Sequence, residues 1–248
     1  MTAESRRRGI LVPAAVAVAA LIVLLGLGTW QLERKAWKEA LIATLDRRLN
    51  DAPIGLPPPT EWTGMTPENS EFTRVRLHVE FPKAADALVF TSGSAIRDDV
   101  KDTGYFVFSP ARLPNGQQVV VNRGFVPDRS YPVAAGAADI VGALRWPEAG
   151  SAFVSDHDAA GDVWMVRDPA AMAQWKGWGA VAPFYLEQEA PVPPGGLPHP
   201  APLQVRLRND HLQYAVTWYG LAAVLVVMFV IWAARRRHDE APLKFDNQ

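Results

Sequence analysis

Two long apolar segments, one near each end of the chain, constrain the fold more than any other feature of the sequence. Residues 10–28 contain no charged side chain, and neither do residues 216–234. At 1.5 Å per residue, a helix of that length spans about 28 Å, close to the thickness of a bilayer's hydrocarbon core. We therefore expect two transmembrane helices, over residues 10–29 and 209–234, the second with a polar rim.

Three consecutive arginines precede the first segment, at residues 6–8, and three follow the second, at residues 235–237. The positive-inside rule then places both ends of the chain, residues 1–9 and 235–248, in the cytoplasm and the central part in the periplasm. A cleaved signal peptide is the alternative for the first segment. Signal peptides usually have a shorter apolar region, which favours a multi-pass protein of the plasma (inner) membrane.

Residues 30–52 continue from the first apolar segment without a helix breaker. Trp30, Arg34, Trp37, Leu41 and Leu45 recur at helical spacing, which predicts one face of a helix. We expect this extension of the first helix to leave the membrane and to bury that face against the domain that follows.

A change from helical to alternating periodicity marks the central domain. Prolines at residues 53–59 end the helix, and residues 73–81 then alternate apolar with polar side chains, as a half-buried strand does. The sequence predicts a mainly antiparallel β domain over residues 53–208, with a hairpin turn at Pro114-Asn115-Gly116. It also predicts a short helix, residues 170–175, capped by Asp168. Further strands are expected at residues 88–91, 105–109, 118–122, 140–145, 163–166, 184–187 and 203–207.

Composition excludes several classes of function. The chain has no cysteine, so it forms no disulfide, thiolate metal site or iron–sulfur cluster of its own. A net charge of -1 gives no indication of nucleic-acid binding. The common nucleotide-binding, esterase and zinc-protease motifs are missing, and the polar segments 93–104 and 155–162 are expected to be solvated loops. We expect a protein that is not an enzyme.

His211 is the histidine with the most specific surroundings, because it stands at the rim of the second apolar segment. Tyr214, Ala215, Trp218 and Ala222 follow it on one helical stripe. A haem could lie along such a stripe with its iron on the imidazole. An interfacial anchor is the alternative, and the residues by themselves favour it.

Several stretches resemble the surfeit locus family of cytochrome c oxidase assembly proteins. Taken in order along the chain, they are GTWQLERKAWK (28–38), FTRVRLHVEF (72–81), VVVNRGFVP (119–127), PFYLE (183–187) and RNDHLQYAVTWYGLA (208–222). Phe125 stands where the family usually has tryptophan. Order, spacing and the two-span layout agree over nearly the whole chain.

The resemblance implies a role in assembling the respiratory chain's haem–copper oxidase. It implies that the chain binds haem a, with His211 as the ligand of the haem iron, and acts as a chaperone that helps haem a reach the oxidase catalytic subunit. Haem a synthase and the lipid bilayer are the other partners it suggests.

The same comparison brings in the first helix. If the two helices pair, Trp30 and Trp37 would form an aromatic wall beside His211. Arg34, Arg206 or Arg208 could bind haem propionates. Interfacial anchoring is an equal alternative for the arginines. A membrane-anchored scaffold that holds an oxidase subunit without any cofactor is the alternative for the whole chain.

Overall fold

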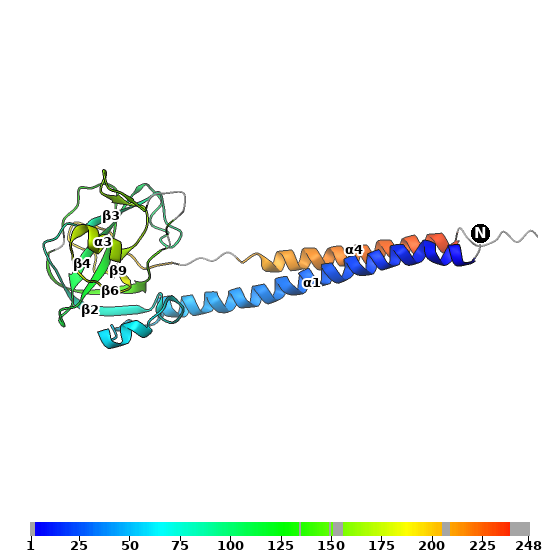
Figure 1. The fold of residues 1–248 in the computed structure, drawn as a ribbon, viewed down its shortest axis with the longest axis horizontal. Helices are drawn as coiled ribbons and strands as arrows, with labels where there is room; N and C mark the ends of the chain where they lie inside the picture. The colour runs from blue at the N-terminus through cyan, green and yellow to red at the C-terminus, as the bar shows by residue number, and fades with distance from the viewer. Residues whose placement is uncertain (1–2, 134, 149, 151–155, 205–208, 239–248) are drawn as a thin grey trace, which may run out of the picture. The chain divides into compact units, whose positions relative to one another are not determined.

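The computed structural model describes residues 3–133, 135–148, 150, 156–204 and 209–238, with side chains from residue 11 to residue 236. The chain divides into two compact units, Met1–Ile42 with Leu207–Gln248, and Ala43–Arg206. The first unit holds two long helices and the second a β domain (Figure 1). The predicted pair of apolar helices and the β-rich domain between them are therefore present.

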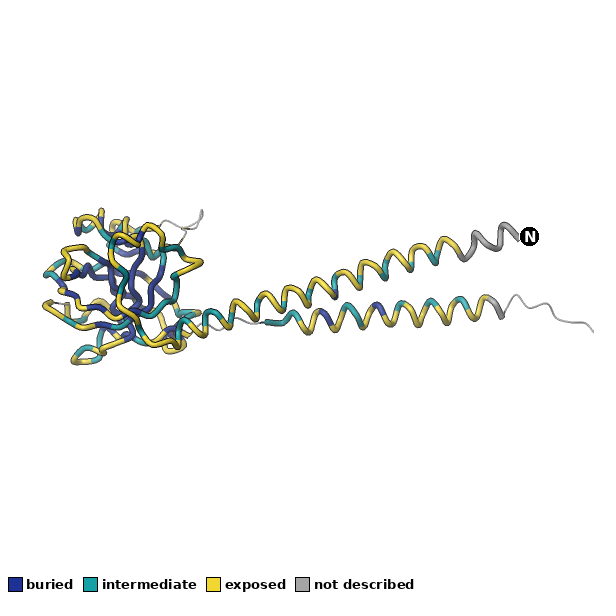
Figure 2. Tube along the Cα trace, turned by 90° about the horizontal axis from the view of Figure 1, so that it is seen from below, coloured by how far each residue is buried: buried dark blue, intermediate teal, exposed yellow. Residues whose placement is uncertain are grey.

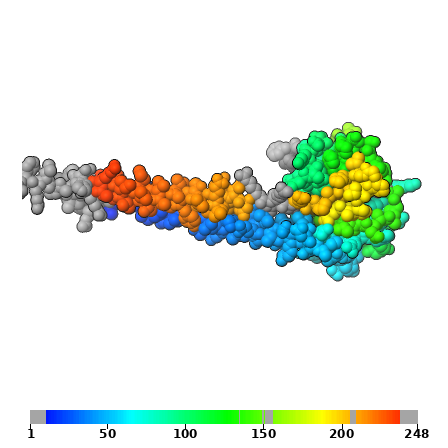
Figure 3. All heavy atoms as spheres, turned by 180° about the vertical axis from the view of Figure 1, so that it is seen from behind, coloured from blue at the N-terminus to red at the C-terminus, as the bar shows by residue number. Residues whose placement is uncertain are grey.

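Helices α1 (Ala3–Asn50) and α4 (His211–His238) form the first unit, apart from the last turns of α1. They run antiparallel, because Gln31 meets His211 at one end while Ala14 and Ala17 share a groove with Phe229 and Val230 at the other. Figure 3 shows the two helices in contact. Leu11–Asn50 and His211–Arg236 have the length and apolar composition that a membrane-spanning helix requires.

The β domain is built on a closed ring of strands. The sheet order is β1-β2-β6-β9-β5-β4-β3-β8-β7, and an additional β2–β4 pairing, Glu80 with Arg112, closes β2, β6, β9, β5 and β4 into a five-stranded barrel. Within the ring β5 and β9 are parallel and the other neighbours antiparallel. The strands are β1 (Ile54–Gly55), β2 (Arg74–Phe81), β3 (Ala87–Thr91), β4 (Gly104–Arg112), β5 (Gln118–Val126), β6 (Gly136–Arg145), β7 (His157–Asp158), β8 (Val163–Trp164) and β9 (Tyr185–Ala190).

Strand β2 shows why the alternating pattern forms a half-buried strand. Val75, Leu77, Val79 and Phe81 are buried, and the residues between them are exposed, as successive side chains of a strand point to opposite faces. Strands β5 and β9 differ because both of their faces are buried. Their apolar side chains pack alternately into two separate core clusters, which explains the uninterrupted run of valines at 119–121 in β5.

Short helices complete this domain: η1 (Pro59–Gly64), α2 (Pro67–Ser70) and α3 (Pro169–Lys176). Helix α3 confirms its predicted start, because the Asp168 carboxylate accepts hydrogen bonds from the amides of Ala170 and Ala171, each at 3.0 Å. It ends at Gly177, whose left-handed backbone suits glycine. The predicted hairpin turn also forms between β4 and β5, with Gly116 at a φ of 83°.

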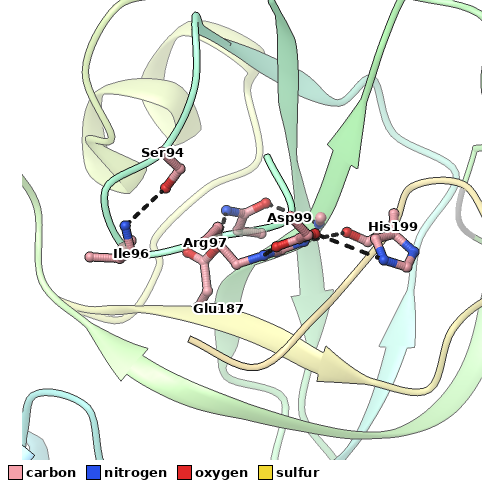
Figure 4. Close-up of polar contacts among 8 residues, drawn as sticks. Ser94, Ile96, Arg97, Asp99, Glu187 and His199 are labelled. Carbon is pink, nitrogen blue, oxygen red and sulfur yellow. Dashed lines mark hydrogen bonds and ion pairs between the residues drawn. The ribbon is translucent and has the colours of Figure 1, made fainter. Parts of the chain in front are cut away.

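Three predictions about the β domain need correction. Within the segment 155–162, His157 and Asp158 form strand β7, and the His157 ring stacks on Trp164 with 4.1 Å between the ring centroids, so this segment is not simply a solvated loop. Residues 201–204 form no strand, and the rest of the predicted strand 203–207 lies outside the described residues. The segment 93–104 is not simply solvated, because Arg97 is fully buried. Figure 4 shows Arg97 beside Asp99 and His199. Its guanidinium donates to the Asp99 carboxylate at 2.8 and 2.7 Å and to the His199 carbonyl at 3.0 Å, so it ties the proline-rich segment 191–202 to the loop between β3 and β4.

The extension of α1 carries the predicted stripe. Trp30 and Trp37 each expose about half of their surface, at 53% and 52%, so the partner helix does not bury them. The end of α1 belongs to the β domain's unit. Arg48 donates to the backbone carbonyls of Glu68 and Glu71 at 2.8 and 3.0 Å, and this joins the last turns of α1 to the β domain.

Candidate cofactor site on the helix pair

His211 is the first residue of α4, and its side chain reaches across to α1. Its Nδ1 lies 2.7 Å from Oε1 of Gln31. The Asp210 carbonyl accepts a 3.3 Å hydrogen bond from the Tyr214 amide, so Asp210 occupies the N-cap position of the helix. The polar rim predicted from the sequence therefore serves two purposes: it starts α4 and it joins the two helices.

Small residues let the two helices approach closely just beside this contact. Ala215 is 1% exposed, and Gly28 is also buried. A methyl group at Gly28 would lie 2.9 Å from the ring of Tyr219, closer than carbon atoms approach without displacement. The Tyr219 hydroxyl is in turn 3.1 Å from Oγ1 of Thr29. Small residues with a few polar contacts are typical of interfaces between membrane helices.

The predicted aromatic residues lie around this contact with different exposures. Tyr214 is 55% exposed, Trp30 is similarly exposed, and Trp218 is partly buried. The small members of the predicted stripe, Ala215 and Ala222, are the ones that face inward. The stripe of α4 is thus divided, with small residues packed inside and large rings left free to meet a ligand.

Arg34 is exposed and lies over the ring of Trp37, 4.0 Å from its centroid. This is a cation–π contact, and it places a positive charge one turn beyond Gln31 on α1. The other two predicted propionate partners, Arg206 and Arg208, lie outside the described residues.

The donor set at His211 has the chemistry that a haem iron requires. An amide oxygen is an acceptor only, so the contact with Gln31 assigns the ring proton to Nδ1. A neutral imidazole then keeps a lone pair on Nε2, the form in which histidine ligates metals. Among the described residues, no group of three or more histidine and carboxylate side chains could hold a bare metal ion. The one imidazole at this position is a donor of the type that haem iron accepts.

Sequence reasoning missed Gln31 as a site residue, although it lies inside the motif GTWQLERKAWK. A signal was available, because a polar side chain at the end of an apolar helix needs a partner there. The choice of partner could not be predicted, since Gln31 and His211 are 180 positions apart.

Arg123, from the third motif, lies in the barrel and belongs to a separate cluster. Its Nη1 donates to the Pro132 carbonyl at 3.4 Å, and its guanidinium lies 5.7 Å from the Phe81 ring. Burial lowers the pKa of Arg123, while the nearby Asp86 charge opposes this change. Burial likewise raises the pKa of Asp86, whose carboxylate accepts a 2.5 Å hydrogen bond from Ser109. These contacts give Arg123 a structural role inside the β domain.

Comparison with known proteins gives consistent matches along the chain. A family model described as the SURF1 family matches residues 18–223. A SURF1-like protein of Monosiga brevicollis is 35% identical over 244 residues, which cover 93% of this chain and 90% of that protein. Surfeit locus protein 1 of Rattus norvegicus is 33% identical, covering 80% of this chain and 68% of its own length. The Homo sapiens protein of the same name is 31% identical, with coverages of 82% and 71%.

Proposed function

The chain belongs to the SURF1 family, and we propose that it binds haem a through His211 and assists delivery of this cofactor to the catalytic subunit of haem–copper oxidase. Membership in the family implies a role in cytochrome oxidase assembly. The observation that supports the haem step is the 2.7 Å contact between Gln31 and His211, because a neutral imidazole that donates its Nδ1 proton to the amide oxygen keeps its lone pair on Nε2.

Each residue of the site has a distinct task in this proposal. His211 would hold the haem iron through Nε2, and the haem, when bound, would supply the metal that accepts this nitrogen. Apolar surface for a flat ligand would come from Tyr214, Trp218 and Trp30. Tyr214 and Trp30 each expose more than half of their surface. Arg34 supplies a positive charge for carboxylate groups at the water boundary.

The proposal describes a carrier and not a catalyst. The family that the chain belongs to is associated with assembly of cytochrome oxidase, which favours a non-catalytic role. A single axial histidine at the end of a helix holds a ligand without surrounding it, which suits a cofactor that must be passed on. We propose the oxidase catalytic subunit as the receiver and haem a synthase as a candidate donor.

The location follows from the two apolar helices, which are compatible with membrane anchoring. We propose that both helices span the inner membrane, with both ends of the chain in the cytoplasm and the β domain in the periplasm. The arginine triplets at residues 6–8 and 235–237 support this orientation. A periplasm-dependent reporter fused at Gly196 should be active; an inactive reporter there, with an active one after Arg237, would reverse the topology.

The decisive experiment measures haem a per protein after purification from cells that make this cofactor. The parent should carry haem in stoichiometric yield, and His211→Ala should lose it while accumulating normally, since a partly buried imidazole at the end of a helix adds little packing. His211→Met should keep part of the haem with a shifted spectrum, because a thioether can also ligate haem iron. Leu212→Ala is the matched control, because it truncates the exposed neighbouring residue.

Two results would contradict the proposal. If His211→Ala retains haem with an unchanged spectrum, His211 is not the ligand and acts as an interfacial anchor. A colourless parent protein that still supports oxidase assembly would favour a scaffold that grips an oxidase subunit and binds no cofactor.

A further inference from the structure

We infer that Gln31 is the positioning residue for the haem ligand: its amide oxygen holds His211 in the Nδ1–H form, so that Nε2 is the atom offered to iron. The assignment of a ligand rests on the proposed function, whereas the ring tautomer does not. Gln31 touches no reacting group itself and acts through His211.

The geometry of the contact fixes where the proton lies. The Nδ1 to Oε1 distance of 2.7 Å is that of a strong hydrogen bond. The oxygen has no proton to donate, so the imidazole must be the donor. A neutral ring has one N–H, and with that proton on Nδ1 the lone pair is on Nε2. Without this partner the ring could carry its proton on either nitrogen.

The helix pair explains how Gln31 reaches His211. Gly28 precedes Gln31 by three positions on α1, and His211, Ala215 and Tyr219 recur every four positions on α4, so each set lies on one helix face. The Tyr219 ring packs against Gly28 because glycine has no Cβ at that place, and Ala215 is almost fully buried. The close approach at these small residues brings the two side chains within hydrogen-bonding distance.

A purely structural role is the competing explanation, in which Gln31–His211 merely joins two helices. The chain provides a matched control, because Thr29 and Tyr219 form a second side-chain contact between the same helices at 3.1 Å. Tyr219→Phe removes that contact and leaves His211 untouched. Gln213→Leu repeats the chemical change of Gln31→Leu at an exposed position of α4.

The first measurement is made on haem-free protein in detergent, with nitrogen-15 in its histidines. His211→Ala identifies the His211 signals by their disappearance. The parent, Tyr219→Phe and Gln213→Leu should show the Nδ1–H form of His211, and Gln31→Leu should shift the ring toward Nε2–H. An Nε2–H ring in the parent, or an unchanged ring in Gln31→Leu, would overturn the inference whether or not haem is bound.

The second measurement uses the haem-loaded protein. Loss of a partner that orients a metal-bound histidine typically weakens binding 10- to 100-fold, so we expect Gln31→Leu to lose about that factor in haem affinity. Gln31→Glu should keep the haem and lower its reduction potential, since a carboxylate makes the imidazole a stronger donor. Tyr219→Phe should change neither. Equal affinities and potentials in Gln31→Leu, Tyr219→Phe and the parent would show that Gln31 only joins the helices.

The two failures can be told apart. A parent protein without haem would overturn the proposed function, and the nitrogen-15 spectra would still decide the tautomer. The parent could bind haem and His211→Ala could lose it, while Gln31→Leu binds haem as tightly as the parent. That result would support the proposed function and overturn the positioning role of Gln31.

Discussion

The β domain and the helix pair differ in the burial of their large apolar side chains. In the barrel, the large apolar residues point inward, and Figure 2 shows buried positions gathered in the strands. Along α1 and α4 most of the large apolar residues are exposed, and the buried positions are small, such as Gly28, Ala215 and Ala222. So large an exposed apolar surface is uncommon in soluble proteins, and it is compatible with membrane anchoring of these two helices.

This difference separates the residues that stabilise the protein from those that serve the site. In the barrel, removing a large side chain leaves a cavity. In the helix pair, removing a large ring exposes little, and what matters is which small residues allow contact and which polar groups meet. Mutations can therefore test the comparison in each region by the same thermal assay.

The largest effect should come from Phe184→Ala in the barrel. Phe184 is 1% exposed, with its ring 5.2 Å from Trp62 and 5.7 Å from Trp146. Truncation of a buried phenylalanine typically costs about 3–5 kcal/mol. Trp37→Ala removes a larger ring from a half-exposed position and should cost less than about 1 kcal/mol. Thermal unfolding of both variants in detergent measures this, and similar losses would show that Trp37 is buried in the working protein.

Local patterns predicted much of the barrel. The alternation of β2, the turn at Gly116 and the Asp168 cap each depend on residues within a few positions of one another, so the sequence displays them directly. Closure of the barrel depends on the single pairing of Glu80 with Arg112, which no local pattern indicates. The burial of Arg97 was missed for the same reason, because its second partner, the His199 carbonyl, is 102 positions away.

Of the two residues in the contact between His211 and Gln31, only His211 was predicted from the sequence. His211 was identified because it stands at the rim of an apolar segment, a position where an ionisable group is unusual. Its partner was hidden, because helical spacing groups residues on one helix but does not say which faces of two helices meet. The large residues of the α1 stripe likewise gave no indication of the face that meets α4, which carries Gly28 on α1 and Ala215 on α4.

An intermediate effect should come from Ala215→Leu, which adds bulk where the helices meet. Overfilling a packed interface typically costs about 1–3 kcal/mol. The chain has no cysteine, so a disulfide between cysteines introduced at Leu21 and Leu225, which line one groove of about 110 Å³ between the helices, would report on their pairing. Its yield should fall in Ala215→Leu, while the barrel melts at the parent temperature.

Val216→Leu is the control for this variant, since the neighbouring side chain is 64% exposed. It should leave the cross-linking yield unchanged. Equal losses in both variants would mean that α4 turns a different face toward α1.

The smallest effect should come from Tyr219→Phe, which removes one polar contact from the helix pair. The Thr29 hydroxyl also donates to the Leu25 carbonyl at 3.0 Å, so in the 3.1 Å contact with Tyr219 the tyrosine must be the donor. Losing the tyrosine hydroxyl therefore leaves no unsatisfied donor on Thr29. Side-chain hydrogen bonds between membrane helices are worth about 0.6 kcal/mol on average, and we expect a loss of that size in the cross-linking and thermal assays. A loss as large as that of Ala215→Leu would mean that polar contacts, and not the small residues, hold the two helices together.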